Sequence, residues 1–194
     1  MTTTSTRADP AAARRARRTL ITIAAAVIAP VALSYFFYYL APRAAFTNYG
    51  ELLPTVSLPE LAGTTIDGQP FRLAELHGKW TILVAAGGAC DAACGETLYA
   101  TRQARTMQGK DMDRVARAWI VTDDAVPAPE RLAEHPGIVV ARLPASAVAK
   151  LPKGGSAVVL MDPLGNQVLA WPRQPDPKAL AKDLSRLLKA SRIG

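Results

Sequence analysis

An uncharged run of 21 residues near the N-terminus, from Leu20 to Leu40, is the feature that most limits how this chain can fold. At about 1.5 Å per residue, a helix of that length crosses the roughly 30 Å hydrocarbon core of a bilayer. A cluster of four arginines precedes the run, whereas only Arg43 closely follows it. By the positive-inside rule, the N-terminus then faces the cytoplasm. We therefore predict a single-pass protein of the inner (plasma) membrane with a periplasmic C-terminal domain.

A cleaved signal peptide is the alternative interpretation, because small residues lie between Ala41 and Ala45. The apolar regions of signal peptides are only about 7–15 residues long, so the length of this run favours an uncleaved anchor. The predicted organisation is a disordered basic cytoplasmic tail, a transmembrane helix, a linker and a folded extracytoplasmic domain, at residues 1–19, 20–40, 41–56 and 57–194.

The net charge of +7 belongs mostly to the N-terminal part of the chain. Residues 44–194 contain 17 Lys and Arg against 15 Asp and Glu, which leaves a charge of only +2. The basic balance therefore does not indicate a nucleic-acid partner, and we expect none. About 150 residues is the size of one ordinary domain.

Strand and helix patterns alternate along this part of the chain, which predicts an α/β domain with a central sheet flanked by helices, a thioredoxin-like fold. Asp176 and Pro177 are typical of a helix start and precede regularly spaced leucines, so a C-terminal helix is expected there. The predicted strands are 80–86, 115–121, 137–143, 156–161 and 167–171, after a hairpin of 58–61 with 71–73, and the other predicted helices are 96–108 and 129–134.

The only two cysteines, Cys90 and Cys94, follow the predicted strand 80–86 in a glycine-rich bend that opens a helix. The unpaired N–H groups and the dipole of a helix N-terminus favour a thiolate, so this pair is the candidate redox or metal site. In an oxidising compartment such a pair is also often a purely structural disulfide. A disulfide at this spacing needs the first cysteine in the bend rather than in regular helix. We expect Asp91 to be a helix N-terminal charge rather than a catalytic acid.

Three stretches of the chain together resemble the Sco/SenC family of thioredoxin-like proteins: Gly78-Lys79-Trp80, the C-x-x-x-C motif of Cys90 and Cys94, and the run from Leu160 to Asn166. The resemblance implies a membrane-anchored domain that helps assemble the dinuclear copper centre of cytochrome c oxidase. It also implies that Cu(I) is held by the two cysteines and a distal histidine. The expected partners are an oxidase subunit or another copper or thiol assembly factor.

The chain departs from the family at the third copper ligand. The family's Asp-His pair falls on Lys153-Gly154, so the third ligand is unknown. Ser156 stands where thioredoxins carry a cis-proline that faces the cysteines. The remaining candidate ligands are expected to have structural or surface positions. We expect His77 and His135 at the surface, Met107 buried on the predicted helix 96–108, and Met112 in a loop. Asp123 and Asp124 are expected to form a solvated turn.

Three functions remain open. The preferred one is an oxidase assembly factor that works by thiol–disulfide exchange or by handling Cu(I), because thiolates are soft ligands that suit this ion. The second is a binding or scaffold module without metal, in which Cys90 and Cys94 form a structural disulfide. The third is a membrane-tethered thiol–disulfide oxidoreductase unrelated to copper.

Overall fold

The computed structural model describes residues 10–40, 48–58, 60–191 and 193. The chain divides into an N-terminal helical unit and a compact domain that begins at Asn48. Our predictions for residues 1–9 and 41–47 lie outside the described residues.

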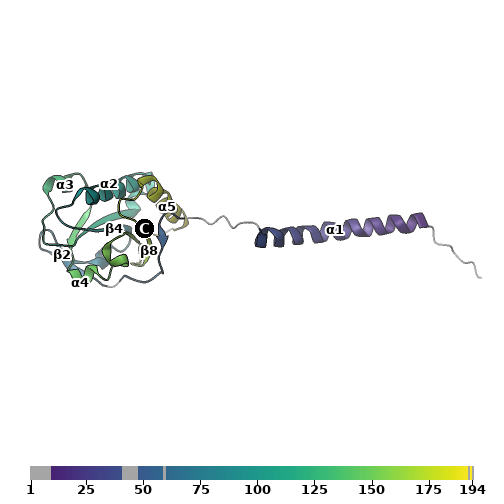
Figure 1. Ribbon diagram of the computed structural model, residues 1–194, viewed down its shortest axis with the longest axis horizontal. Coiled ribbons are helices and arrows are strands. Elements are labelled where there is room, and N and C mark those ends of the chain that lie inside the picture. Colours follow the sequence, from purple (N-terminus) through teal and green to yellow (C-terminus); the bar gives the residue numbers. More distant parts are fainter. Residues whose placement is uncertain (1–9, 41–47, 59, 192, 194) are drawn as a thin grey trace, which may run out of the picture. The chain divides into compact units, whose positions relative to one another are not determined.

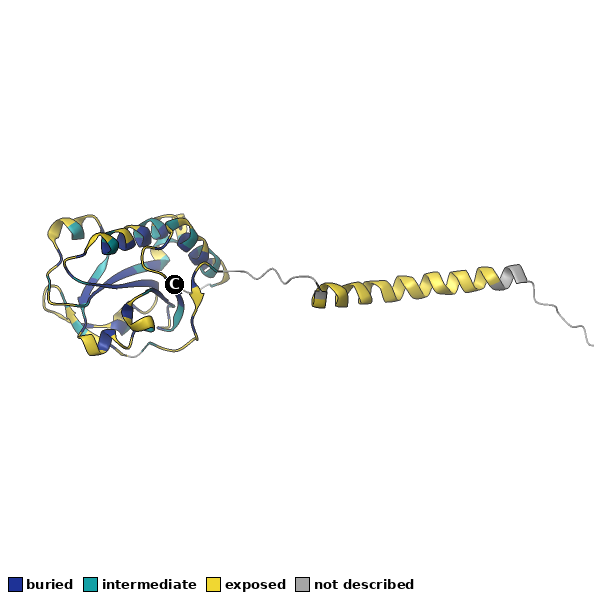
Figure 2. Cartoon of the chain, in the orientation of Figure 1, coloured by how far each residue is buried: buried dark blue, intermediate teal, exposed yellow. Residues whose placement is uncertain are grey.

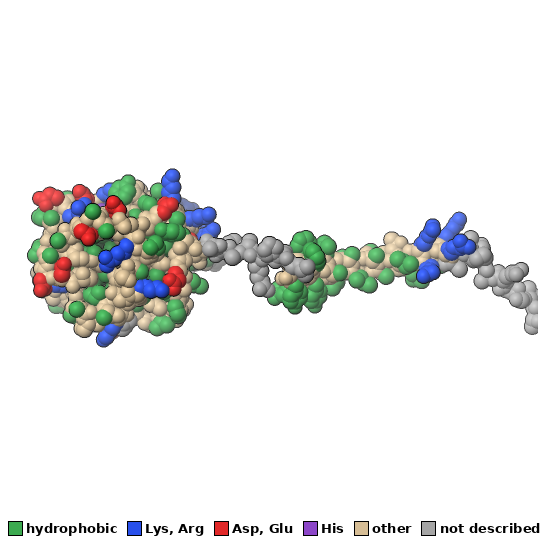
Figure 3. Space-filling view, viewed as in Figure 1, with side chains coloured by type: hydrophobic (Ala, Val, Ile, Leu, Met, Phe, Trp, Pro, Cys, Tyr) green, Lys and Arg blue, Asp and Glu red, His purple; other side chains and the backbone are tan. Residues whose placement is uncertain are grey.

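The N-terminal unit contains one helix, α1 (Pro10–Leu40), with Pro30 inside it. Its segment Arg14–Tyr39 is long and apolar enough to cross a membrane, judged by length and composition. Figure 3 shows Lys and Arg side chains gathered at one end of α1 and hydrophobic side chains along the rest. The helix begins ten residues before the predicted span, so residues 10–19 are helical and not part of a disordered tail. Alanine and arginine, which dominate that stretch, are strong helix formers.

The domain is built on one eight-stranded sheet in the order β1-β8-β7-β4-β5-β6-β2-β3. β2, β4 and β8 are labelled in Figure 1. Its central strand, β4 (Trp80–Ala86), is parallel to β5 (Val115–Val121) and antiparallel to β7 (Val158–Met161). β6 (Val139–Arg142) extends the sheet beyond β5, and β8 (Gln167–Trp171) extends it beyond β7. The predicted thioredoxin-like α/β fold is confirmed.

The two edges of the sheet differ from the prediction. The hairpin pairs β2 (Ala62–Thr65) with β3 (Pro70–Arg72), so its first strand lies later than the expected 58–61. At the other edge, β1 (Glu51–Leu52) pairs with β8, although these residues were expected in the linker 41–56. The buried carboxylate of Asp183 accepts hydrogen bonds from the N–H of Gly50 at 2.8 Å and from Trp171 Nε1 at 3.1 Å. This contact ties the start of the domain to its last helix.

Helices cover both faces of the sheet, and the core lies between them and the strands (Figure 2). α2 (Ala92–Thr106) and α5 (Pro177–Ala190) pack on one face, and α4 (Ala145–Val148) lies on the other. Asp176 caps α5 as predicted, since its Oδ1 accepts a hydrogen bond from the N–H of Lys178 at 2.8 Å. The shorter helices are α3 (Pro129–Ala133) and the 3-10 turns η1 (Leu73–Leu76), η2 (Gly109–Arg114) and η3 (Pro152–Gly155).

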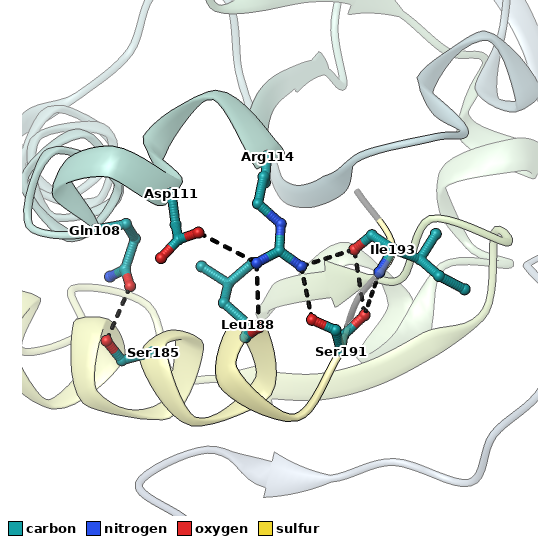
Figure 4. A network of polar contacts seen from close by, with 7 residues as sticks. All are labelled: Gln108, Asp111, Arg114, Ser185, Leu188, Ser191 and Ile193. Atoms are coloured by element: carbon teal, nitrogen blue, oxygen red, sulfur yellow. Dashed lines mark hydrogen bonds and ion pairs between the residues drawn. The ribbon is translucent and has the colours of Figure 1, made fainter.

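A polar network fixes the C-terminal end of α5 (Figure 4). The guanidinium of Arg114 donates hydrogen bonds to the carbonyl oxygens of Leu188 at 3.1 Å and Ser191 at 2.9 Å. The hydroxyl of Ser185 donates to Gln108 Oε1 at 3.1 Å. These contacts join α5 to the segment that follows α2, so the two helices are held together on the face that carries the cysteines.

Candidate functional site

The cysteines lie where the central strand β4 ends and the chain turns into α2. Two positions in this turn, Gly87 and Gly88, lie so close to the loop after β5 that a side chain would not fit there. A Cβ atom on Gly88 would overlap the carbonyl oxygen of Ala125, and one on Gly87 would lie 2.5 Å from Asp123 Oδ2. The turn therefore packs directly against the loop after β5, and only glycine allows this close approach.

Cys90 and Cys94 form a disulfide, with their Cα atoms 5.1 Å apart. Cys90 lies in the bend with a φ of 49°, in the left-handed region, and Cys94 lies in the first turn of α2. This matches the expectation that the first cysteine must stand outside regular helix. Each cysteine is buried, with 7% of its surface exposed.

Asp91 sets the start of α2. Its Oδ1 accepts a hydrogen bond from the N–H of Cys94 at 2.8 Å, so it is the N-cap of the helix. The predicted role as a helix N-terminal charge is confirmed. Because Asp91 supplies this cap, α2 begins at Ala92, earlier than the predicted start at residue 96.

A cavity of about 220 Å³ opens beside the disulfide. It is formed by the end of β4, the turn, the start of α2 and residues from three other segments, including Asp123, Ala157 and Arg173. Three charged side chains therefore share the space next to the sulfur atoms: Asp91, Asp123 and Arg173.

Arg173 is the cation of this cavity. It is exposed and makes no hydrogen bond or ion pair with any residue that the structure describes. The next residue, Gln174, donates its backbone N–H to Thr97 Oγ1 at 3.1 Å, and Thr97 is buried one turn after Cys94. The loop between β8 and α5 is thus anchored on α2, which keeps Arg173 beside the disulfide. The sequence pattern gave no signal for this residue, because the contact joins segments 77 residues apart.

Ser156, at the position of the thioredoxin cis-proline, does not line the cavity beside the cysteines. Ser156 is exposed and its hydroxyl donates to the carbonyl oxygen of Lys153 at 2.7 Å, while Ala157 lines the cavity in its place. Lys153 and Gly154, at the family's ligand position, both adopt left-handed φ angles, 55° and 61°. Lys153 Nζ forms an ion pair with Glu51 at 2.9 Å. Neither Lys153 nor Gly154 lines the cavity.

The other sulfur and histidine candidates also lie away from the cysteines. Met107 ends α2 and is 50% exposed, so its predicted burial is wrong. Met112 is half-buried in η2, not in a loop. His77 is exposed at the end of η1, as predicted. None of the three lines the cavity.

His135 is not a surface residue as predicted, since only 2% of it is exposed. It follows α3 in the turn that leads to β6, and this turn folds over β5 near Arg117. Burial, followed by repulsion from Arg117, lowers the pKa of His135 from 6.5 to about 4. The imidazole is therefore neutral at physiological pH.

Asp123 and Asp124 are exposed after β5, as predicted, and Asp123 also has a structural role. Asp123 Oδ1 accepts hydrogen bonds from the N–H groups of Gly88 at 2.8 Å and Ala125 at 3.2 Å. Within the described residues, no group of three or more His, Cys, Asp or Glu side chains could hold a metal ion. The two cysteines are the soft donors of this cavity.

Residues 80–191 match the model of a family described as transmembrane-like, thioredoxin-like, C-terminal domain. Among solved structures, copper-bound ScoI of Bradyrhizobium japonicum is similar at 21% identity and a TM-score of 0.55, over 68% of this chain and 99% of that chain. Copper-bound yeast Sco1 is similar at 21% identity and a TM-score of 0.60, over 72% and 96%. A thiol:disulfide interchange protein from Bacteroides sp. is similar at 14% identity and a TM-score of 0.53, over 73% and 93%.

No curated protein matches the chain in sequence. At these identities the structural likeness establishes the fold, and it confirms the resemblance to Sco proteins that the motifs predict.

Proposed function

Because the chain belongs to the family of transmembrane-like, thioredoxin-like C-terminal domains, we propose that it exchanges thiols and disulfides with another protein through Cys90 and Cys94. The observation that carries this proposal is the position of the pair. The disulfide joins the bend after the central strand to the first turn of α2, and it borders a cavity that Arg173 also lines.

The exchange chemistry needs only the disulfide and a partner dithiol. A partner thiolate attacks one sulfur of the pair, the Cys90–Cys94 bond breaks, and a mixed disulfide forms while the other cysteine leaves as a thiolate. The second partner thiolate then attacks the partner's own sulfur in the mixed disulfide, and the cysteine of this chain leaves as a thiolate. The partner becomes a disulfide, and the pair gains two electrons and becomes a dithiol.

The charges around the pair determine how readily a thiolate leaves. The N-terminus of α2 and the guanidinium of Arg173 stabilise a thiolate, whereas the carboxylates of Asp91 and Asp123 oppose it. Arg173 is also the positive group at the cavity that an approaching partner thiolate meets. We propose that it attracts the partner thiolate and stabilises the leaving one.

Cu(I) transfer is the second candidate function. The favouring observation is that the reduced pair offers two soft thiolates from positions whose Cα atoms lie 5.1 Å apart. The solved ScoI of Bradyrhizobium japonicum and yeast Sco1, with the same fold, contain copper. The described residues of the cavity supply no third soft ligand, so a complete three-coordinate site does not fit this chain alone. A Cu(I) ion carried as cargo would be held by Cys90 and Cys94 and by a ligand from the partner.

We place this chemistry outside the cytoplasm. α1 would anchor the domain to the inner membrane, and the arginines at its start would keep the N-terminus inside. The periplasm is oxidising, which suits a pair that works as a disulfide. The partner that we propose is a subunit of cytochrome c oxidase or another factor that delivers copper or thiols to it.

The reduction potential of the pair tests exchange against a structural role. The full-length protein in detergent is equilibrated in thiol redox buffers, and the reduced fraction is measured by alkylation. A potential above about −300 mV supports exchange, and a potential well below it indicates a structural disulfide. In a Cys94→Ser variant the remaining Cys90 thiolate can attack the disulfide of the oxidised partner and release one partner thiolate, which should trap a mixed disulfide in membranes. The Cys90→Ser/Cys94→Ser double variant is the control.

Copper handling is tested separately by a competition titration of the reduced protein with a Cu(I) chelator. Binding of one Cu(I) that is lost in the double cysteine variant supports the second candidate. Binding equal to that of the double variant removes it and leaves exchange as the function.

A further inference from the structure

A second open cavity, of about 560 Å³, borders the turn of α2 that carries Cys94. Ala92 and Gly95 line this cavity, whereas Ala93 and Cys94 line the cavity beside the disulfide. Successive residues of an α-helix point in directions about 100° apart around its axis, so the two cavities lie on different sides of one helical turn. We call the second cavity the α2 groove.

The loop between β8 and α5 borders both cavities. Arg173 lines the cavity beside the disulfide, and the next two residues, Gln174 and Pro175, line the α2 groove. The first four residues of α2 are Ala, Ala, Cys and Gly, so no long side chain of this turn separates the two cavities. A chain bound at the sulfur atoms can therefore continue into the groove.

The α2 groove has an apolar wall. Tyr99 lines it and is 50% exposed, and Pro175 and Pro177 line it as well. Tyrosine and proline lose little conformational freedom when another molecule covers them, so this wall suits contact with an apolar side chain.

Both charged side chains of the groove already have partners. Glu96 Oε2 accepts a hydrogen bond from the side-chain amide of Gln174. Arg131 Nη1 donates to Glu134 Oε2 at 2.7 Å. The groove therefore offers apolar surface rather than an unpaired charge.

Gly95 is not explained by the fold alone. Glycine destabilises a helix relative to alanine, and the φ of Gly95 is not in the left-handed region. A Cβ atom there would have Arg131 Nη1 as its nearest neighbour outside the helix backbone, at 3.4 Å, which is an ordinary contact. The missing side chain leaves space in the groove beside Cys94, where the main chain of a bound segment can approach closely.

A partner joined to the cysteines is within reach of the groove. A mixed disulfide places the partner's cysteine Cα about 4.4–6.8 Å from the Cα of the cysteine that it binds. In an extended chain, the residues two and three positions further lie roughly 7–10 Å beyond. Tyr99 is five residues after Cys94, a rise of about 7.5 Å along the helix. The Cα atoms of Cys90 and Cys94 are 5.1 Å apart, so the same reach serves either sulfur.

We propose that the α2 groove binds the extended segment next to the reacting cysteine of the partner protein, with a large apolar side chain of that segment against Tyr99. This inference rests on the thiol–disulfide exchange proposed above and names the feature by which the partner is selected. The bonds that form and break are those of the exchange, and the groove supplies binding only.

Two cysteine peptides test the proposal. Each is blocked at both ends and carries its single cysteine as a mixed disulfide with thionitrobenzoate, and leucines stand two and three positions from the cysteine in one peptide and serines in the other. A thiolate of the reduced full-length protein in detergent attacks the peptide sulfur, and thionitrobenzoate leaves and is measured by its absorbance. The remaining cysteine then displaces the peptide thiolate and restores the Cys90–Cys94 disulfide.

We expect the leucine peptide to react about fivefold faster than the serine peptide, which is less than full burial of a leucine side chain would give. Tyr99→Ser should reduce this ratio to less than about twofold. It should not change the rate with the corresponding disulfide of mercaptoethanol, which has no side chain for the groove. Partition of the peptides into micelles is the same for both proteins and does not affect the comparison.

An equal leucine preference in wild type and Tyr99→Ser, or no preference in the wild type, would overturn the groove as the docking site and leave exchange in place. A reduction potential in the range of structural disulfides would overturn exchange itself and this proposal with it. The two failures are therefore distinguishable.

Matched variants assign the effect to the groove. Gly95→Gln fills the groove with a neutral side chain that favours helix, so it should remove the leucine preference without lowering the melting temperature. This variant keeps the test valid if Tyr99→Ser does not fold. Thr106→Gln, an exposed change at the end of α2, and Leu164→Ser, at a residue that is 67% exposed and lines neither cavity, should both keep the preference. Loss of the preference in these two controls would contradict the assignment.

Discussion

The carboxylate of Asp123 accepts a hydrogen bond from the backbone N–H of Gly88 at 2.8 Å. This bond joins the loop after β5 to the turn that carries Cys90, two residues further on. The same carboxylate also lines the cavity beside the disulfide. Asp123 therefore both holds the turn in place and contributes negative charge near the sulfur atoms.

We expect Asp123→Ala to lower the free energy of unfolding by about 1 kcal/mol, because Gly88 and Ala125 lose a charged hydrogen-bond acceptor. It should also speed the reaction of the pair with a small thiol, since a charge that disfavours the thiolate is removed. Urea unfolding and the rate of reduction by glutathione measure the two effects. Asp124→Ala is the matched control, because its exposed side chain makes no hydrogen bond or ion pair with any described residue. Equal effects of the two substitutions would contradict the role of Asp123.

We expect Arg173→Gln to slow the alkylation of the reduced pair about two- to threefold at neutral pH, because an exposed positive charge near a thiol moderately favours the thiolate. The pH profile of alkylation should move to higher pH, and Arg173→Lys should restore most of the rate. A purely structural role of Arg173 would leave the profile in place. Lys178→Gln, an exposed change at the start of α5, controls for the loss of net charge.

His135 should make the domain less stable in acid. Its pKa is about 4 in the folded protein and 6.5 when unperturbed, so the unfolded chain takes up the proton first as the pH falls. The stability is therefore complete above about pH 6.5, decreases below it, and levels off near pH 4. By pH 4.5 we expect a loss of about 2–3 kcal/mol.

Urea unfolding of the full-length protein between pH 7.5 and 4.5 measures this loss. The slope should be shallower in His135→Gln, whose side chain does not titrate. Identical slopes in the two proteins would show that other groups cause the acid sensitivity.

The elements that the sequence predicts well are those whose signals are local. β4 is a continuous apolar run, and Asp176, Pro177 and the following leucines mark α5 within one segment. The cysteine pair was found in the same way, because a glycine-rich bend after a buried strand is a local pattern.

The features that the sequence does not predict depend on distant contacts. The sequence predicts His135 as an exposed loop residue before a proline. It is buried because its turn folds onto β5. β1 has two residues and forms because β8 and Asp183 hold it, 117 or more residues away. Arg173 reaches the cysteines through a loop anchored on Thr97. Local patterns contain no information about such partners.

The carboxylate of Asp183 anchors the segment that leads into β1. Asp183 is buried and accepts hydrogen bonds from the N–H groups of Tyr49 and Gly50 and from Trp171 Nε1. Asp183→Asn keeps the shape but replaces one acceptor oxygen with an amide that faces these donors. We expect a loss of about 2–3 kcal/mol, because buried donors are left without a charged partner.

Urea unfolding measures this loss, and hydrogen exchange at Gly50 reports on the start of the domain. Asp176→Asn is the matched control, since asparagine is as good an N-cap as aspartate and should change the stability little. Faster exchange at Gly50 in Asp183→Asn alone would show that this carboxylate holds the segment that leads into β1. Unchanged exchange and unchanged stability would mean that pairing with β8 is sufficient to hold it.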